Sequence, residues 1–190
     1  MKEKWMSSVM AGVFISMGAM TYLAIPNTLV GSLFFAVGIL LVLNLHNMLV
    51  TRVCPLMVYD RRYHWAGNGI GTLIAAAAVQ GTRFKETIRE SLTRISETKL
   101  ADSPLSLFIL AVFCGFFVAF AVLIGARYEK GSFAQIFYVW FFITAFVFCG
   151  FEHIVADMFY LSCCWLQYGI DGLEALKVLA LVTAGNLAGG

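Results

Sequence analysis

Charged side chains are scarce in this chain. Aspartate, glutamate, lysine and arginine make up 13% of its 190 residues, whereas hydrophobic residues make up 61%. A typical soluble domain has about 25% charged residues and does not contain apolar stretches as long as those found here. The composition therefore excludes a soluble globular domain and predicts a polytopic membrane protein. The formal net charge of +2 is too small to indicate nucleic-acid binding.

Cysteine pairs with the spacing of a metal or disulfide motif are also missing. No two of the five cysteines form a C-x-x-C pair, so neither a zinc site nor a disulfide framework is indicated. Most of them lie inside apolar stretches, where free thiols pack as small hydrophobic groups. We therefore predict no metal and no cofactor. The cysteines are Cys54, Cys114, Cys149, Cys163 and Cys164.

Long apolar segments are what the chain does contain. A helix rises 1.5 Å per residue, so roughly 20 apolar residues cross a hydrocarbon core about 30 Å thick. The first segment lacks a small-residue cleavage site and leads into another span, so we keep it as a mature helix. The sixth reaches the last residue before completing a crossing, and we expect the chain to stop inside that helix. The predicted spans are 7–25, 28–50, 65–81, 104–126, 133–166 and 175–190.

Two of the apolar runs are too long for one straight crossing. A continuous helix over 133–166 would measure on the order of 50 Å, against a core of about 30 Å. An interrupted helix is tolerated in a membrane where the freed backbone lines a cavity enclosed by protein. We place one break at "GFEHIVADM", residues 150–158, and the other at "NLHNMLVTR", residues 44–52, within the run 29–59.

The two broken runs indicate an internal repeat. "GNGIG" at 67–71 follows the first broken run, and "GNLAGG" at 185–190 follows the second. Three spans per half is an odd number, so the halves must be oppositely oriented. We predict an all-α integral membrane fold with an aquaporin-like arrangement: six transmembrane helices in two inverted three-helix repeats, with broken second and fifth helices. The chain is one membrane domain, with repeats at about 5–81 and 105–190.

The segment 82–104 between the repeats is the only long polar stretch. Ile88, Leu92 and Ile95 recur in it at helical spacing among charged residues. This pattern predicts an amphipathic linker helix on the membrane surface. The alternative is a solvated linker helix without a functional role.

Three ionisable residues in the second break need an explanation, because a charged group at bilayer depth costs at least about 2.5 kcal/mol. Glu152 can accept hydrogen bonds from the freed backbone N–H groups. His153 can exchange a proton with a weak-acid anion near neutral pH, or it can be a neutral histidine bonded to a backbone carbonyl. We expect Asp157 to pair with a basic or hydrogen-bonding group across the repeat. A metal site formed by Glu152 and His153 with His46 or His64 is a further alternative.

These motifs resemble the formate/nitrite transporter family. "GFEHIVADMFY" is similar to that family's fifth-span motif G-F-E-H-x-V-A-N-M, and "GNLAGG" to its sixth-span motif G-N-x-x-G-G. "MAGVFISMGAM", "GILLVLNLHNMLVT" and "GNGIG" are similar, at lower fidelity, to its first three spans. Lys99 falls where the family commonly has a lysine ahead of its fourth span.

The resemblance implies a homopentamer in the lipid bilayer, expected in the bacterial cytoplasmic membrane. Each protomer would be a channel or proton-coupled transporter for small monovalent anions such as formate, nitrite or hydrosulfide, and not an enzyme. His153 would be the pore histidine and proton relay. The other implied roles are a constriction at Leu49 and Val50, anion attraction by Lys99 and Arg52, and support of the broken helices by Thr51, Glu152, Asp157, Asn68 and Asn186.

The second span departs most from the family's pattern. Its glutamate, phenylalanine, glycine and asparagine are replaced here by Met48, Val50, Arg52 and Val53, and the fifth-span asparagine is replaced by Asp157. Arg52 can bind an anion or pair with a carboxylate, and both roles remain open. Two other functions are therefore kept as alternatives: a membrane-embedded metal enzyme and a non-conducting regulatory relative.

Overall fold

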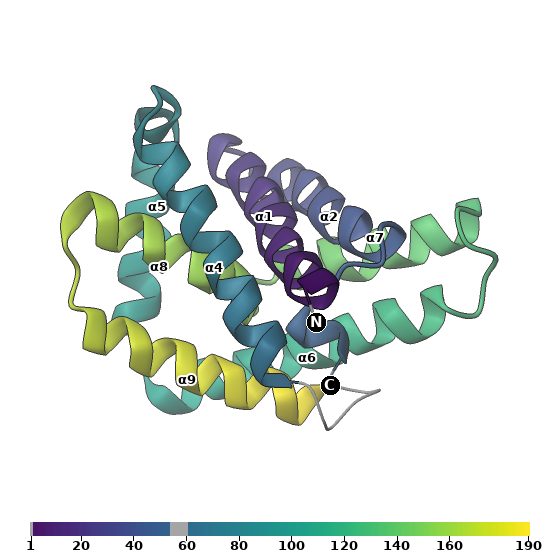
Figure 1. The fold of residues 1–190 in the computed structure, drawn as a ribbon. Coiled ribbons are helices and arrows are strands. Elements are labelled where there is room, and N and C mark those ends of the chain that lie inside the picture. The colour runs from purple at the N-terminus through teal and green to yellow at the C-terminus, as the bar shows by residue number, and fades with distance from the viewer. Residues whose placement is uncertain (1, 54–60) are drawn as a thin grey trace.

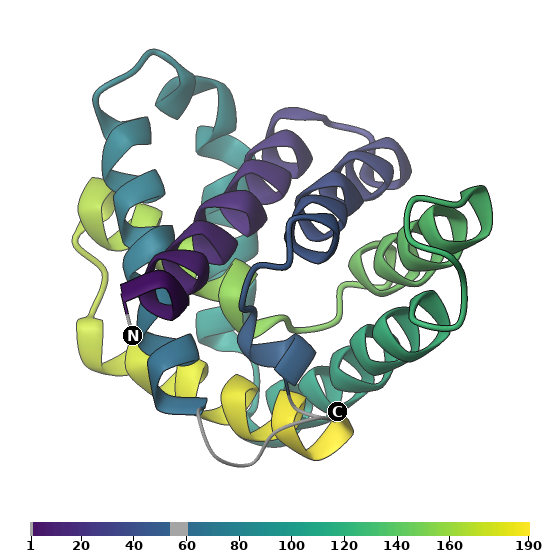
Figure 2. The same cartoon turned by 45° about the vertical axis from the view of Figure 1, so that its right-hand side comes forward.

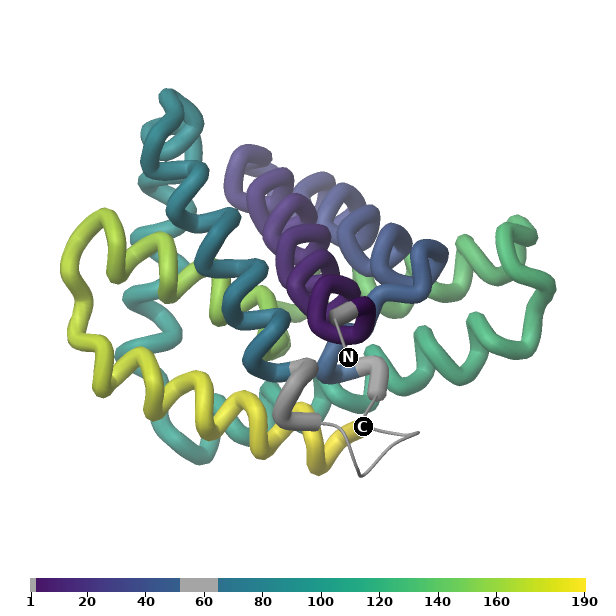
Figure 3. The backbone as a smooth tube through the Cα atoms, viewed as in Figure 1, coloured from purple at the N-terminus to yellow at the C-terminus, as the bar shows by residue number. Residues whose placement is uncertain are grey.

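The computed structural model describes residues 2–53 and 61–190, with side chains for residues 3–51 and 65–190. All regular secondary structure in these ranges is helical (Figures 1 and 3). Asn27, Ser103, Ser132 and Asp171 begin helices as N-caps, because each side-chain oxygen accepts a backbone N–H bond. The helices are α1 Lys2–Ala24, α2 Thr28–Asn44, α3 Val50–Val53, α4 Arg61–Gln80, α5 Phe84–Ala101, α6 Pro104–Gly125, α7 Phe133–Phe148, α8 Ile154–Tyr168 and α9 Gly172–Gly189.

The helices form two similar groups of three spans. In the first, α1 packs along α2 and α4, and in the second, α6 packs along α7 and α9. The second span is divided into α2 and α3, and the fifth into α7 and α8 (Figure 2). Among the described residues, three segments are long and apolar enough to cross a membrane: Glu3–Ala24, Pro104–Gly125 and Gly172–Gly189. The predicted fold class, with broken second and fifth helices, is confirmed.

Backbone-to-backbone contact joins the first and third spans of each repeat. A Cβ atom added to Gly12 of α1 would lie 2.2 Å from the carbonyl oxygen of Asn68 in α4. A Cβ atom on Gly115 of α6 would lie 2.6 Å from the carbonyl oxygen of Asn186 in α9. Small residues at such positions let membrane helices approach closely. The contacts hold the two asparagines at equivalent depths in the two repeats.

The linker helix α5 packs on protein. Ile88 and Leu92 are completely buried, and the same face continues with the buried residues Ser96 and Lys99. This face contacts α8 and α1. The apolar face of α5 therefore packs against other helices of the protein. We had expected this face to lie on the membrane. The periodicity is the same in both cases, because each requires one apolar stripe.

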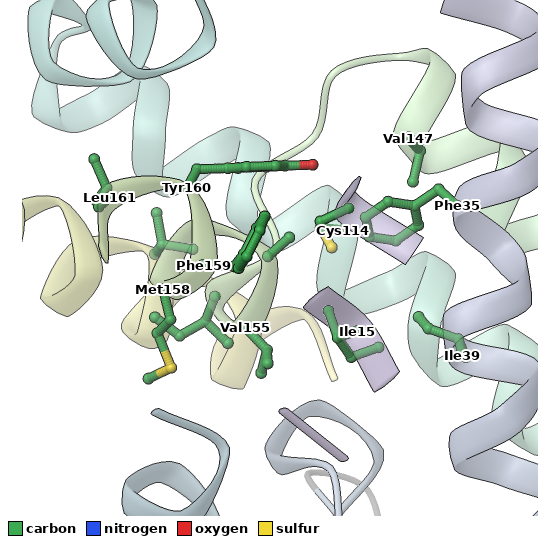
Figure 4. Packing of buried hydrophobic residues seen from close by; sticks show 14 of the residues in the cluster. Ile15, Phe35, Ile39, Cys114, Val147, Val155, Met158, Phe159, Tyr160 and Leu161 are labelled. Carbon is green, nitrogen blue, oxygen red and sulfur yellow. The ribbon is translucent and has the colours of Figure 1, made fainter. Parts of the chain in front are cut away.

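The helix α8 lies at the centre of the molecule. Every residue of its first two turns, 154–161, is buried, and α8 contacts α4, α1, α5 and α9. Figure 4 shows Val155, Phe159 and Tyr160 of this helix among core side chains, with Phe35 of α2 beside Val147 of α7. Because α8 is surrounded by protein here, its polar residues do not face lipid.

Candidate pore site

The two breaks follow the same backbone course. The first spans residues 45–49, between α2 and α3, and the second spans 149–153, between α7 and α8. In the first, the N–H of Asn47 donates to the carbonyl of Val42 at 2.9 Å. In the second, the N–H of Phe151 donates to the carbonyl of Phe146 at 3.1 Å. Each helix therefore ends in the same way before the chain turns inward (Figure 2).

The residue after each helix C-cap has left-handed backbone geometry. This residue is His46 in the first break, with φ of 56°, and Gly150 in the second, with φ of 71°. Glycine adopts this conformation without a steric cost, whereas a residue with a Cβ atom does not. The two breaks are thus equivalent position by position, and His46 occupies the place of a glycine.

Asn68 of α4 closes the first break. Its side-chain oxygen accepts a hydrogen bond from the N–H of Val50 at 2.8 Å, and its amide nitrogen donates to the carbonyl of Met48 at 2.9 Å. The same nitrogen lies 2.7 Å from the carbonyl oxygen of Ser8 in α1. A backbone donor and a backbone acceptor freed by the break are thereby satisfied inside the protein.

Asn186 of α9 does the same for the second break. Its side-chain oxygen accepts from the N–H of Ile154 at 2.9 Å, and its amide nitrogen donates to the carbonyl of Glu152 at 2.7 Å. The amide nitrogen also donates to the carbonyl of Ala111 in α6 at 2.8 Å. Both asparagines of the Gly-Asn motifs therefore bind the two ends of a break and the first helix of their own repeat.

His153 lies at the meeting point of the two repeats. It is 2% exposed, and its Nε2 atom is 3.1 Å from Oγ1 of Thr51 in α3. Its Nδ1 atom accepts from the N–H of Ala156 at 3.3 Å, so His153 is the N-cap of α8. Because Nδ1 acts as an acceptor, the proton of the neutral ring is assigned to Nε2, which then donates to the hydroxyl of Thr51. His153 thus has one N–H directed at the other repeat.

A cluster of three charged groups adjoins this histidine. The ammonium of Lys99 pairs with the carboxylate of Glu152, and it lies 2.9 Å from Oδ1 of Asp157. Burial alone would lower the pKa of Lys99, but the carboxylates of Asp157 and Glu152 outweigh burial and raise this pKa above its ordinary value. Lys99 is therefore a permanent cation. We expected the Glu152 carboxylate to accept freed backbone N–H groups, but it pairs with Lys99, and the N–H of Ile154 donates to Asn186.

A cavity of about 350 Å³ opens onto this cluster. Its wall includes Thr28 and Phe35 of α2 and Phe146 of α7. The ring of Phe146 stacks on that of His153 at a centroid distance of 5.7 Å. Arg94 of α5 also lines it. Basic groups, aromatic rings and His153 therefore line one cavity.

A second cavity, of about 270 Å³, lies at the other ends of α2 and α7. Its wall includes Leu43 near the end of α2, His46 of the first break, Lys130, and Gln135 and Val139 from the first half of α7. Nζ of Lys130 lies 2.6 Å from Nε2 of His46. His46 is thus associated with a lysine here, and not with Glu152 as the metal-site alternative required. In the described part of the chain, no three His, Cys, Asp or Glu side chains form a metal-binding group.

The structure brings several of the predicted site residues together. Lys99, Glu152, His153 and Asp157 line the first cavity, and Thr51 contacts His153 from the other repeat. The predicted constriction residues Leu49 and Val50 are buried, at 1% and 4% exposure. The side chains of Arg52 and His64 lie outside the described residues.

Sequence reasoning missed the aromatic and basic wall of the first cavity. Phe35 and Phe146 pack edge to face, with centroids 6.2 Å apart, and both line the cavity with Arg94. No sequence signal separates these two phenylalanines from the other 15 of the chain's 17. Arg94 is one of many charges on α5, and only its position five residues before Lys99 distinguishes it.

The fold and site define a class of protein: a multi-pass membrane protein whose inverted repeats bring two broken helices together at a buried polar site. Comparison with solved structures agrees with this class. The chain superposes on a solved structure, a pentameric formate channel with formate bound, with a TM-score of 0.90. The two sequences are 21% identical, and the match covers 99% of this chain and 92% of the other.

The sequence comparisons identify the family. The formate/nitrite transporter family matches over residues 1–190. An uncharacterized transporter, YwcJ of Bacillus subtilis, is 30% identical over 140 residues, and the match covers 69% of this chain and 54% of the relative. The nitrite transporter NirC of Salmonella typhimurium is 24% identical, with 98% and 78% covered. The chain belongs to the formate/nitrite transporter family, and it matches about half the length of the Bacillus relative.

Proposed function

We propose that this chain forms a pore for small monovalent anions of weak acids, the class that contains formate, nitrite and hydrosulfide. The observation that carries the proposal is the contact between Thr51 and His153, 3.1 Å apart, at which the two broken helices meet. The names of the similar proteins, a nitrite transporter and a formate channel, support the substrate class. The same similarity supports a homopentamer that acts as a pore and not as an enzyme, placed in a bacterial cytoplasmic membrane.

The first step in this function is the collection of anions in the first cavity. Arg94 and Lys99 provide positive charge along its wall, although Lys99 is 8% exposed and shares its charge with two carboxylates. A cation at the mouth of a pore raises the local concentration of anions. Of the two, Arg94 is the cation without a buried carboxylate partner in the described structure, so we assign the larger part of the attraction to it.

The second step is passage through the apolar part of the path. The rings of Phe35 and Phe146 and the buried side chain of Leu49 offer no hydrogen bonds to an anion. A bare anion is costly to move into such surroundings, whereas its neutral conjugate acid crosses more easily. The N–H of His153 and the hydroxyl of Thr51 are the polar groups at this depth that can bind the anion and exchange a proton with it.

The test is anion flux into proteoliposomes, measured for formate, nitrite and hydrosulfide at several pH values. We compare the unmodified protein with His153→Asn at equal density, because asparagine can also cap α8 while it lacks a titratable ring. We expect saturable flux that the substitution lowers by about tenfold or more, which corresponds to ~1.4 kcal/mol in the barrier. Absence of flux for all three anions in intact oligomers would overturn the proposal and favour a non-conducting relative.

A further inference from the structure

We propose that Glu152, Asp157 and Lys99 form a proton-binding site in the pore wall. In this inference, which rests on the proposed function, one bound proton changes the cluster from a net negative charge to neutrality and thereby allows anions to pass. The site would be a pH-dependent gate on permeation, separate from any proton that His153 exchanges with the transported species.

The geometry places all three groups in one buried space. The side chains of Lys99, Glu152 and Asp157 are 9%, 7% and 1% exposed. The two carboxylates come from positions five residues apart on either side of the start of α8, and both contact the single ammonium of Lys99. Apart from this ion pair, neither carboxylate oxygen of Asp157 accepts a hydrogen bond in the described structure.

The charges of this cluster do not balance when all three groups are ionised. Two carboxylates and one ammonium leave a net charge of −1, and a buried charge without a partner is strongly unfavourable. A proton from cavity water that forms an O–H bond on one carboxylate makes the cluster neutral. The protonated carboxyl group can then donate a hydrogen bond to the remaining carboxylate.

The surroundings do not supply a second partner at contact distance. Five other titratable or charged groups surround Asp157. They are His153 of the second break, Tyr22 of α1, Arg94 of α5, Cys114 of α6 and Tyr160 of α8. Of these, Arg94 carries a permanent charge, and the described structure has no salt bridge between it and either carboxylate. Proton binding is therefore the direct route to a neutral cluster.

The consequence for transport has a definite sign. The cluster lines the same cavity as His153, so a net charge of −1 there repels an entering anion, and a neutral cluster does not. Anion flux should fall as rising pH removes the proton. Asp157→Asn leaves only the neutral Lys99–Glu152 pair, so its flux should no longer depend on this proton.

The experiment measures formate and nitrite flux at a series of pH values for the unmodified protein, Asp157→Asn and a matched control, Asp171→Asn. Asp171 is an N-cap of α9, and asparagine caps equally well. Taking the ratio of variant to unmodified flux at each pH cancels the protonation of the anion itself. We expect this ratio for Asp157→Asn to rise with pH, by up to about tenfold per pH unit, while the control ratio stays constant.

A second readout is independent of transport and of the stability of the variant. Infrared spectra of the unmodified protein should contain a C=O stretching band of a buried protonated carboxyl group that disappears at high pH. A constant flux ratio for Asp157→Asn, or absence of the band at every pH, overturns the proton site. Absence of flux in the unmodified protein, with the band present, overturns the proposed function and leaves the proton site intact.

Discussion

The two broken helices of this protein share a backbone but not a chemistry. In both breaks a left-handed residue follows the helix end, and an asparagine from the third span of the repeat binds both sides of the gap. Yet the position before the new helix is Leu49 in one break and His153 in the other. The difference shows that the asparagines satisfy the freed backbone, so the side chains of the breaks themselves can differ.

The polar break also has a support that the apolar break lacks. Helix α5 lies between the two repeats, and it provides Lys99 for Glu152 and Asp157 of the second break and α8. The residue before Leu49 in the first break is Met48, which needs no cation. Helix α5 is therefore what allows two carboxylates to be buried beside His153.

The largest expected effect comes from removing that support. Lys99→Met leaves two carboxylates buried without a cation, and breaking a buried ion pair from one side costs about 3 to 5 kcal/mol. We expect the free energy of unfolding to fall by about 4 kcal/mol, measured by denaturant titration in mild detergent. Lys130→Met, which removes the exposed lysine between α6 and α7 that contacts His46, is the control and should change little. Equal losses in the two variants would contradict the importance of the buried cluster.

The second-largest effect should come from replacing Asn68 and Asn186. These substitutions test whether the two breaks are equivalent. Asn68→Ala and Asn186→Ala each leave one backbone N–H and one carbonyl without their partner, at about 1 to 3 kcal/mol for each group. We expect a loss of about 3 kcal/mol in both variants, measured in the same titration. A large loss for one asparagine and almost none for the other would show that only one break depends on its asparagine.

Much of the fold follows from the sequence alone. The excess length of two apolar runs indicated both breaks, and the structure places them at 45–49 and 149–153, inside or next to the motifs that carried the prediction. The Gly-Asn pairs at Gly67 and Gly185 marked the helices that close the breaks. These features are local, since they depend on segment length and on residue types at short spacing.

Contacts between distant segments were not predictable in the same way. The apolar stripe of α5 did not reveal whether it faces lipid or protein, because periodicity identifies a buried face and not its partner. For the same reason Lys99 was expected to attract anions, and its contacts with Glu152 and Asp157 emerged only from the packing of α5 on α8. The contact between His46 and Lys130, which lie 84 residues apart, was likewise not indicated by any sequence pattern.

The smallest effect should come from the left-handed position, where the two breaks use different residues. His46 carries a Cβ atom at φ of 56°, while Gly150 at φ of 71° has no atom within 4 Å of the place that a Cβ would occupy. Gly150→Ala therefore adds backbone strain without a clash and should cost about 1 kcal/mol. His46→Gly should relieve strain and raise the free energy of unfolding by about 0.5 kcal/mol, which is less because glycine loses more chain entropy on folding. If His46→Gly instead destabilises the protein, its contact with Lys130 is the reason, and Lys130→Gln should then reproduce the loss.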